Sequence, residues 1–193
     1  MAQTSTTLSG EVSHKADITG TDISISTSGS ISSTSTVLTG TGKLAVRDLV
    51  TVSGTGNNNK TFTVKSVSTG GDFVIVEEAV TTETSDGSTT IRIDTTGFVS
   101  DKFKGDGYYS HPDGVHTVAY KVDTSLTGSI KMQGSLASDP DNAVDWFDID
   151  GTSVGDGSSV VSTQYINFTG NFIWVRSAVT VETGSVTKIQ LNY

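Results

Sequence analysis

Short runs in which apolar and polar residues alternate recur along this chain, and they constrain its fold more than any other feature. Examples are DLVTVSG (48–54), KTFTVKSV (60–67), HTVAYKVD (116–123) and VTKIQLNY (186–193). Successive side chains of a β-strand point to opposite faces, so this period of two places the apolar residues on one face of a sheet. No stretch shows a convincing helical period of 3.6 residues. The pattern predicts an all-β protein.

The composition favours strands joined by tight turns. The 193 residues include 58 Ser and Thr, 21 Gly and only 2 Pro. Thr is common in strands, and Gly allows the backbone conformations that tight turns require. The chain is also poor in charge and proline, which argues against an intrinsically disordered protein.

We expect two β modules after a short lead-in. Residues 1–16 are interpreted as an N-terminal arm or an added strand, residues 17–94 as a small β-barrel or sandwich, and residues 95–193 as a jelly-roll-like β-sandwich. GTGNNN (54–59) lies between two alternating runs, and its Gly and Asn residues are typical of a hairpin connection.

Within residues 17–94 the pattern predicts which side chains are buried. Val50 and Val52 should share one face, and the spacing of the apolar residues in 60–67 predicts a bulge or twist before Val67. The continuous apolar run FVIV (73–76) predicts a strand that is covered on both faces. The strands expected in this module are 22–26, 35–40, 48–54, 60–67, 72–78 and 89–94.

The second module contains an internal similarity between SLTGSIKMQGSLA (125–137) and NFTGNFIWVRSAV (167–179). Each segment is expected to form a Thr-Gly turn followed by a strand that faces the core. This reading places Trp174 in the core.

Charge and cysteine content exclude several classes of function. The net charge is −9, and no basic patch is present to displace phosphate counterions, so we expect no nucleic-acid partner. The absence of cysteine excludes disulfides, thiolate nucleophiles and Cys-ligated zinc. No apolar run reaches the roughly 20 residues of a membrane span, and the N-terminus lacks a secretory pattern, so we expect assembly in a cytoplasm.

The acidic segment SDPDNAVDWFDIDGTSVGD (138–156) is the first candidate for chemistry. Calcium is conceivable, but the spacing does not match a calcium loop, and the placement of paired carboxylates for glycoside hydrolysis cannot be read from sequence. We interpret the segment as a solvated acidic loop in which Trp146 and Phe147 reach the core. Its aspartates are Asp139, Asp141, Asp145, Asp148, Asp150 and Asp156.

The histidines give no recognisable catalytic or metal pattern. His111 and His116 flank a Pro-Asp-Gly turn, where they could converge on a metal, but no third ligand has a recognisable spacing. One histidine at a strand end and the other in a loop is the preferred reading. We therefore assign no catalytic residue, no metal ligand and no cofactor.

Exposed aromatic side chains are the best candidates for a binding surface. Rings near Asp and Asn side chains can stack on sugars, and the alternative role for such rings is to fill cores and interfaces. Tyr108 and Tyr109 should point to opposite faces if that segment is extended. The aromatics considered are Tyr108, Tyr109, Tyr120, Trp146 and Trp174, and the candidate surface or glycan contacts are Tyr108, Tyr109, His111, Asp113, Asp145 and Trp146.

Several segments resemble a β-sandwich module of virion structural proteins from tailed bacteriophages, particularly marine cyanophages. They are KGDGYY (104–109), DGVHTV (113–118), TGSIKMQGSLA (127–137) and DWF (145–147), followed by FTGNFIWVRSAV (168–179) and GSVTKIQLNY (184–193). DLVTVSGTGNNNKTFTVKSV (48–67) is similar to a small β domain found in phage tail and head proteins. These are packing and turn motifs, so no catalytic residue is carried over.

The resemblance implies a non-enzymatic structural protein of a virion, assembled in the host cytoplasm, which decorates or cements the capsid surface. Its expected partners are other virion proteins in a homo-oligomer or symmetric array, with no membrane partner. A tail, neck, baseplate or fibre component is the alternative location. A carbohydrate-binding module that recognises host glycans and, third, a glycan-degrading enzyme are the alternatives of other classes.

Overall fold

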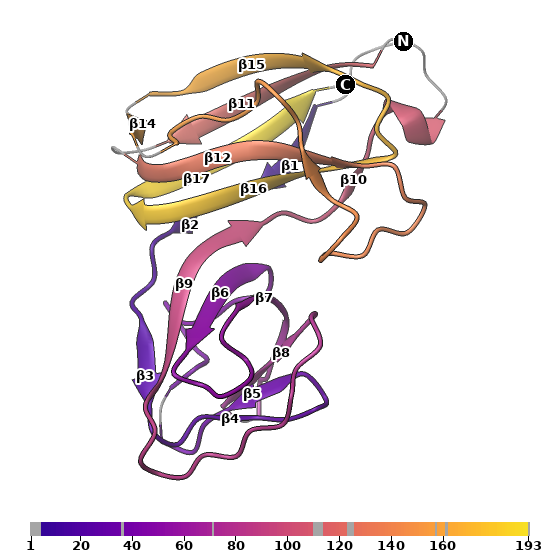
Figure 1. The fold of residues 1–193 in the computed structure, drawn as a ribbon. Coiled ribbons are helices and arrows are strands. Elements are labelled where there is room, and N and C mark those ends of the chain that lie inside the picture. Colours follow the sequence, from indigo (N-terminus) through magenta and orange to yellow (C-terminus); the bar gives the residue numbers. More distant parts are fainter. Residues whose placement is uncertain are drawn as a thin grey trace. The chain divides into compact units, whose positions relative to one another are not determined.

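A computed structural model describes residues 5–35, 37–70, 72–109, 114–122, 126–156, 158–160 and 162–192. Strands make up 51% of the structure and helix 2%, and the sheets are large and antiparallel (Figure 1). The all-β prediction is therefore confirmed. The jelly-roll connectivity of the second module stays a prediction.

The chain divides into two compact units. We call Lys15–Gly97 the small unit, and Met1–His14 together with Phe98–Tyr193 the sandwich unit. The first residues of the chain therefore group with its C-terminal half. Each unit has its own hydrophobic core.

The small unit is built from short strands. They are β3 (Ile18–Gly20), β4 (Ser24–Ile25), β5 (Ser30–Ser32), β6 (Asp48–Ser53), β7 (Thr61–Val67), β8 (Phe73–Val76) and β9 (Ile91–Val99), whose last two residues belong to the sandwich unit. The strand order is β9-β6-β7-β8-β5-β4, and β3 pairs with β9. Val50 and Val52 of β6 are buried, as predicted, and the β7–β8 register shifts between Val64 and Ser66, which confirms the predicted irregularity before Val67.

Two expectations for the small unit are wrong. Of the segment 35–40, residues 35 and 37–40 form no strand, because the carboxylate of Asp72 binds the backbone N–H groups of Leu38 and Thr39 that a strand would use. The strand β8 is not covered on both faces. Val74 and Val76 are buried, whereas Phe73 is exposed. Buried and more exposed side chains therefore alternate along β8, although all four residues are apolar.

The sandwich unit consists of two sheets, which form two layers in Figure 1. The first has the order β1 (Ser5–Ser9), β17 (Ser185–Asn192), β11 (Val115–Val122), β15 (Gln164–Thr169), and β2 (Val12–Ser13) also pairs with β17. The second has the order β13 (Phe147–Asp148), β12 (Leu126–Ser135), β16 (Trp174–Thr183), with β14 (Ser159–Val160) on β12 and β10 (Phe103–Lys104) on β16.

The core of this unit lies between the two sheets. Val118, Tyr120 and Ile189 come from the first sheet, and Ile130 and Val179 come from the second. Their alternation along the strands matches the period of two seen in the sequence.

The internal similarity in the second module does not correspond to equivalent structure. Thr127 and Gly128 lie inside β12, whereas Thr169 ends β15 and Gly170 follows it in a loop. Gly128 has a φ of 144°, and a Cβ atom there would lie 2.2 Å from the backbone oxygen of Thr180. Glycine is therefore required at this irregular position in the strand, and no turn follows it.

Candidate functional site

Two exposed tyrosines lie side by side in the sandwich unit. Tyr108 and Tyr109 end a short 3₁₀ helix, η1 (Asp106–Tyr109), and their side chains are 45% and 47% exposed. Their ring centroids are 5.2 Å apart in an edge-on arrangement. The condition for pointing to opposite faces, an extended segment, is not met, and successive side chains of a 3₁₀ helix are only about 120° apart.

Two glycines allow the backbone around η1 to lie close to its neighbour. Gly105 and Gly107 donate their N–H groups to Ile173 and Phe172. A Cβ atom at Gly105 would lie 2.4 Å from the Phe172 oxygen, and one at Gly107 would lie 2.6 Å from the Asn171 oxygen. No larger residue fits at either position without a shift of the backbone. The close packing that the glycines permit fixes the backbone of the segment that carries the two tyrosines.

Lysine side chains lie over the aromatic rings. Lys104 Nζ is 3.9 Å from the Tyr108 ring centroid and 5.8 Å from that of Tyr109, and Lys102 Nζ is 4.8 Å from Trp174. Trp174 lies 5.4 Å from Tyr108. The interaction with the Tyr108 side chain raises the pKa of Lys104. We call Lys102, Lys104, Tyr108, Tyr109 and Trp174 the aromatic–lysine patch.

The prediction that Trp174 is a core residue is wrong. Its ring is only half-buried, and its Nε1 donates to the backbone oxygen of Ser138 at 3.0 Å. The first residue of β16 sits where the strand leaves the core, which the alternation of the strand does not reveal.

The loop that precedes β13 borders the patch but is organised separately. Trp146 lies under Arg176, with 4.1 Å between the guanidinium carbon and the ring centroid. Asp145 accepts the N–H of Asp141 at 2.7 Å, so it fixes the loop. Trp146 is half-buried, Phe147 is 42% exposed and neither belongs to the hydrophobic core, so the expectation that both reach the core is wrong. His111 and Asp113, the other candidate contacts, lie outside the described residues.

The interior of the sandwich unit holds two polar aromatic side chains. His116 is fully buried, stacks on Phe168 at 4.9 Å, and places its Nε2 3.3 Å from the Gly170 oxygen and 3.9 Å from Asp106 Oδ2. Tyr120 is also fully buried and donates to the Thr152 oxygen at 2.8 Å. Burial raises the pKa of Tyr120. Neither side chain is available for a surface platform.

Two aspartates of the acidic segment are engaged by basic side chains. Asp148 accepts from Lys131 at 2.6 Å and Gln133 at 2.9 Å, and Asp139 accepts from Lys102 at 2.7 Å. Although partial burial acts to raise it, these bonds lower the pKa of Asp148. Across the described ranges, no three acidic or histidine side chains are grouped so as to hold a metal ion.

A hollow of about 550 Å³ lies at one side of the sandwich unit. We call it the β13–β15 hollow, because residues of both edge strands line it. Its lining residues are Phe147, Asp148, Ile149, Asp150, Asn167, Phe168, Thr169 and Phe172.

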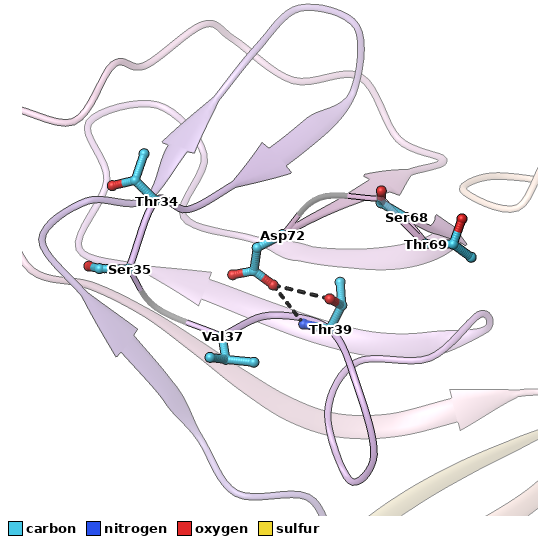
Figure 2. A pocket seen from close by; sticks show the side chains of 7 residues that line it. All are labelled: Thr34, Ser35, Val37, Thr39, Ser68, Thr69 and Asp72. Carbon is cyan, nitrogen blue, oxygen red and sulfur yellow. Dashed lines mark hydrogen bonds between the residues drawn. The ribbon is translucent and has the colours of Figure 1, made fainter.

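The small unit has a hollow of about 380 Å³ lined mainly by Ser, Thr and Asp72, and Figure 2 shows the Asp72 carboxylate directed toward Thr39. The Asp72 carboxylate is engaged by the N–H groups of Leu38 and Thr39. Other carboxylates of this unit accept backbone N–H groups in the same way: Asp22 from Thr34 and Ser35, Glu83 from Gly56 and Asn57, and Asp86 from Ser88 and Thr89. The acidic side chains thus organise loops in a unit that has little regular structure there.

Among the residues that the structure describes, no helix is long and apolar enough to cross a membrane. In comparisons with known proteins, no family model matches this chain, and no curated protein matches it either. The resemblance to phage virion proteins stays a prediction.

Proposed function

We propose that this chain is a non-enzymatic structural protein of a tailed-phage particle, and that it decorates or cements the capsid surface. The aromatic–lysine patch is the observation that carries the proposal. Tyr108 and Tyr109 remain exposed on a support that two close backbone contacts hold in place. Rigid, exposed tyrosine and tryptophan rings are typical of protein contact surfaces, where they bury a large area at a small entropic cost.

The use of the acidic side chains supports the same reading. General acids and metal ligands need carboxylates that can reach a substrate or an ion. In the small unit, Asp22, Asp72 and Glu83 instead accept backbone N–H groups of their own loops. Such carboxylates stabilise the loops. A protein on a particle surface that has no cysteine needs this kind of stabilisation, because it cannot form disulfides.

The test measures where the protein lies on purified phage particles and how many copies are present. Quantitative mass spectrometry should find hundreds of copies per particle, and immunogold labelling should mark the head. A handful of copies at the tail or neck would support the alternative location. Absence of the chain from the particles would overturn the proposal.

A matched pair of variants tests the role of the patch. Tyr108→Ser with Tyr109→Ser should strongly reduce rebinding of the purified protein to particles that lack it. Val46→Ser changes an exposed apolar residue of the small unit and should leave rebinding unchanged. Equal rebinding by both variants would exclude the patch as the contact surface.

Glycan recognition is the second candidate, and the exposed tyrosine pair is the observation that favours it. Lys104 over the Tyr108 ring disfavours it, because a sugar would have to displace the ammonium group to stack on that face. Saturable binding on a glycan array that Tyr108→Ala or Trp146→Ala abolishes, and Val46→Ser preserves, would support this candidate over a purely structural role.

A further inference from the structure

We propose that the edge strand β15 is a docking site for a second copy of this chain, and that two β15 strands pair antiparallel in a symmetric dimer. The strand has six residues and lies at the end of its sheet. One side pairs with β11, from Gln164 opposite Tyr120 to Thr169 opposite Val115. Within the described parts of the chain, no strand pairs with the other side.

Several side chains of β15 are open to solvent. Asn167, Phe168 and Thr169 line the β13–β15 hollow, and Tyr165 is 71% exposed. An unpaired strand edge carries backbone N–H and C=O groups that water satisfies in the monomer and that another strand can satisfy instead. A second strand could therefore pair with this edge without displacing any strand that the structure describes.

In the described parts of both units, the other edge strands are shorter than β15 or have an interrupted register. The strands β4 and β13 have two residues each, and β3 has three. The strand β1 has five, but its register is interrupted between Thr7 and Ser9. Short edges and bulges are common devices against edge-to-edge pairing. β15 has an uninterrupted register, no proline and no charged residue.

The chemistry of β15 favours a copy of itself as the partner. The sequence QYINFT is neutral in a chain of net charge −9, so antiparallel self-pairing brings no like charges together. Side chains of the same face oppose each other, so Tyr165 would meet Asn167 in a register centred on Ile166, or Thr169 in one centred on Asn167. A charged partner strand would find no countercharge on β15. Two-fold dimers are also the commonest closed assemblies.

The proposed dimer adds detail to the proposed structural role. Its role within a particle depends on that proposed function. Its test uses the isolated full chain in solution, so the two are judged separately. Failure to dimerise would leave the particle measurements untouched, and absence from particles would leave the dimer measurement valid.

Sedimentation velocity tests the dimer directly. The chain should sediment with twice its mass of 20.1 kDa as its concentration rises. Tyr165→Lys with Thr169→Lys should weaken dimerisation about tenfold or more, because the introduced lysines lie opposite each other in the register centred on Asn167 and are diagonal neighbours in the one centred on Ile166. Thr187→Lys, at an exposed position of the inner strand β17, should leave it unchanged.

Cysteine cross-linking provides a second measurement that does not depend on charge. Because the natural chain has no cysteine, an introduced thiol can only pair with another introduced one. Asn167→Cys reports the register centred on Asn167, and Tyr165→Cys with Asn167→Cys reports the one centred on Ile166. One of them should form a covalent dimer on oxidation, whereas Thr187→Cys should not. A chain that is monomeric up to about 1 mM, or a dimer that none of the β15 variants affects, would overturn the proposal.

Discussion

Asn58 donates from its side-chain amide to the Glu83 carboxylate at 2.6 Å, joining two loops of the small unit that lie 25 residues apart. The same amide donates to the Thr81 oxygen at 2.8 Å, and its oxygen accepts the Thr81 N–H at 2.9 Å. Asn58 is fully buried. The Asn58 side chain therefore joins the hairpin connection 54–59 to residues 81 and 83 from the inside.

Asn58→Ala should destabilise the small unit by about 2 to 3 kcal/mol, because it removes the three hydrogen bonds that this buried side chain makes to Thr81 and Glu83. Both tryptophans belong to the sandwich unit, so urea unfolding of the small unit is best followed by circular dichroism. Asn57→Ala is the control, since that side chain is exposed. Equal midpoints for the two variants would contradict the assigned role of Asn58.

Glu83 should make the stability of the small unit depend on pH. Although desolvation acts to raise it, the N–H groups of Gly56 and Asn57 lower the pKa of Glu83 below its ordinary value of 4.5. Because the folded pKa lies below the unfolded one, the stabilisation is present above the unfolded value and is lost as the pH falls through the folded value. Asp48 acts in the opposite direction, because burial raises its pKa.

The comparison of wild type with Glu83→Gln isolates the contribution of Glu83. The glutamine does not titrate, so the variant should lose less stability than wild type between about pH 6 and pH 3. Denaturant midpoints across this range provide the measurement. If the denaturant midpoints of the two proteins fell equally with pH, Glu83 would not be the cause of the pH dependence of stability.

Asp72→Ala should loosen the segment that the sequence pattern mistakes for a strand. The amide hydrogens of Leu38 and Thr39 lose a charged acceptor, so their exchange with solvent should become about tenfold faster. Hydrogen exchange followed by NMR measures this. Thr69→Ala changes the same hollow without touching those amides, and should leave their exchange rates as they are.

Tyr120→Phe should cost the sandwich unit about 1 kcal/mol, because the buried Thr152 oxygen loses its hydrogen bond. Tryptophan fluorescence during urea unfolding reports on this unit. Tyr165→Phe removes an exposed hydroxyl and should be neutral. A neutral effect at both positions would indicate that water replaces the Tyr120 hydroxyl.

The parts of the fold that could be predicted from sequence are those that depend on neighbouring residues. The burial of Val50 and Val52 and the irregularity before Val67 follow from the period of two within one strand. Contacts between distant segments were not predictable. Asp72 reaches Leu38 across 34 residues and replaces a strand ladder with side-chain hydrogen bonds.

The candidate site shows the same division. The exposure of Tyr108 and Tyr109 on one surface depends on a 3₁₀ helix, and that helix depends on close backbone contacts at Gly105 and Gly107. Trp174 begins a strand with the expected alternation, but it lies where the strand leaves the core. A glycine-tyrosine run followed much later by a tryptophan gives no sign that these rings meet.

By itself the sequence determined that the protein is all-β, because the alternation of side chains along a strand is a local property of an extended backbone. Only the tertiary structure decided which carboxylates organise loops, which rings are exposed together and which strand edge is left unpaired. Those properties depend on segments tens of residues apart, and packing and hydrogen bonding between the segments bring them into contact.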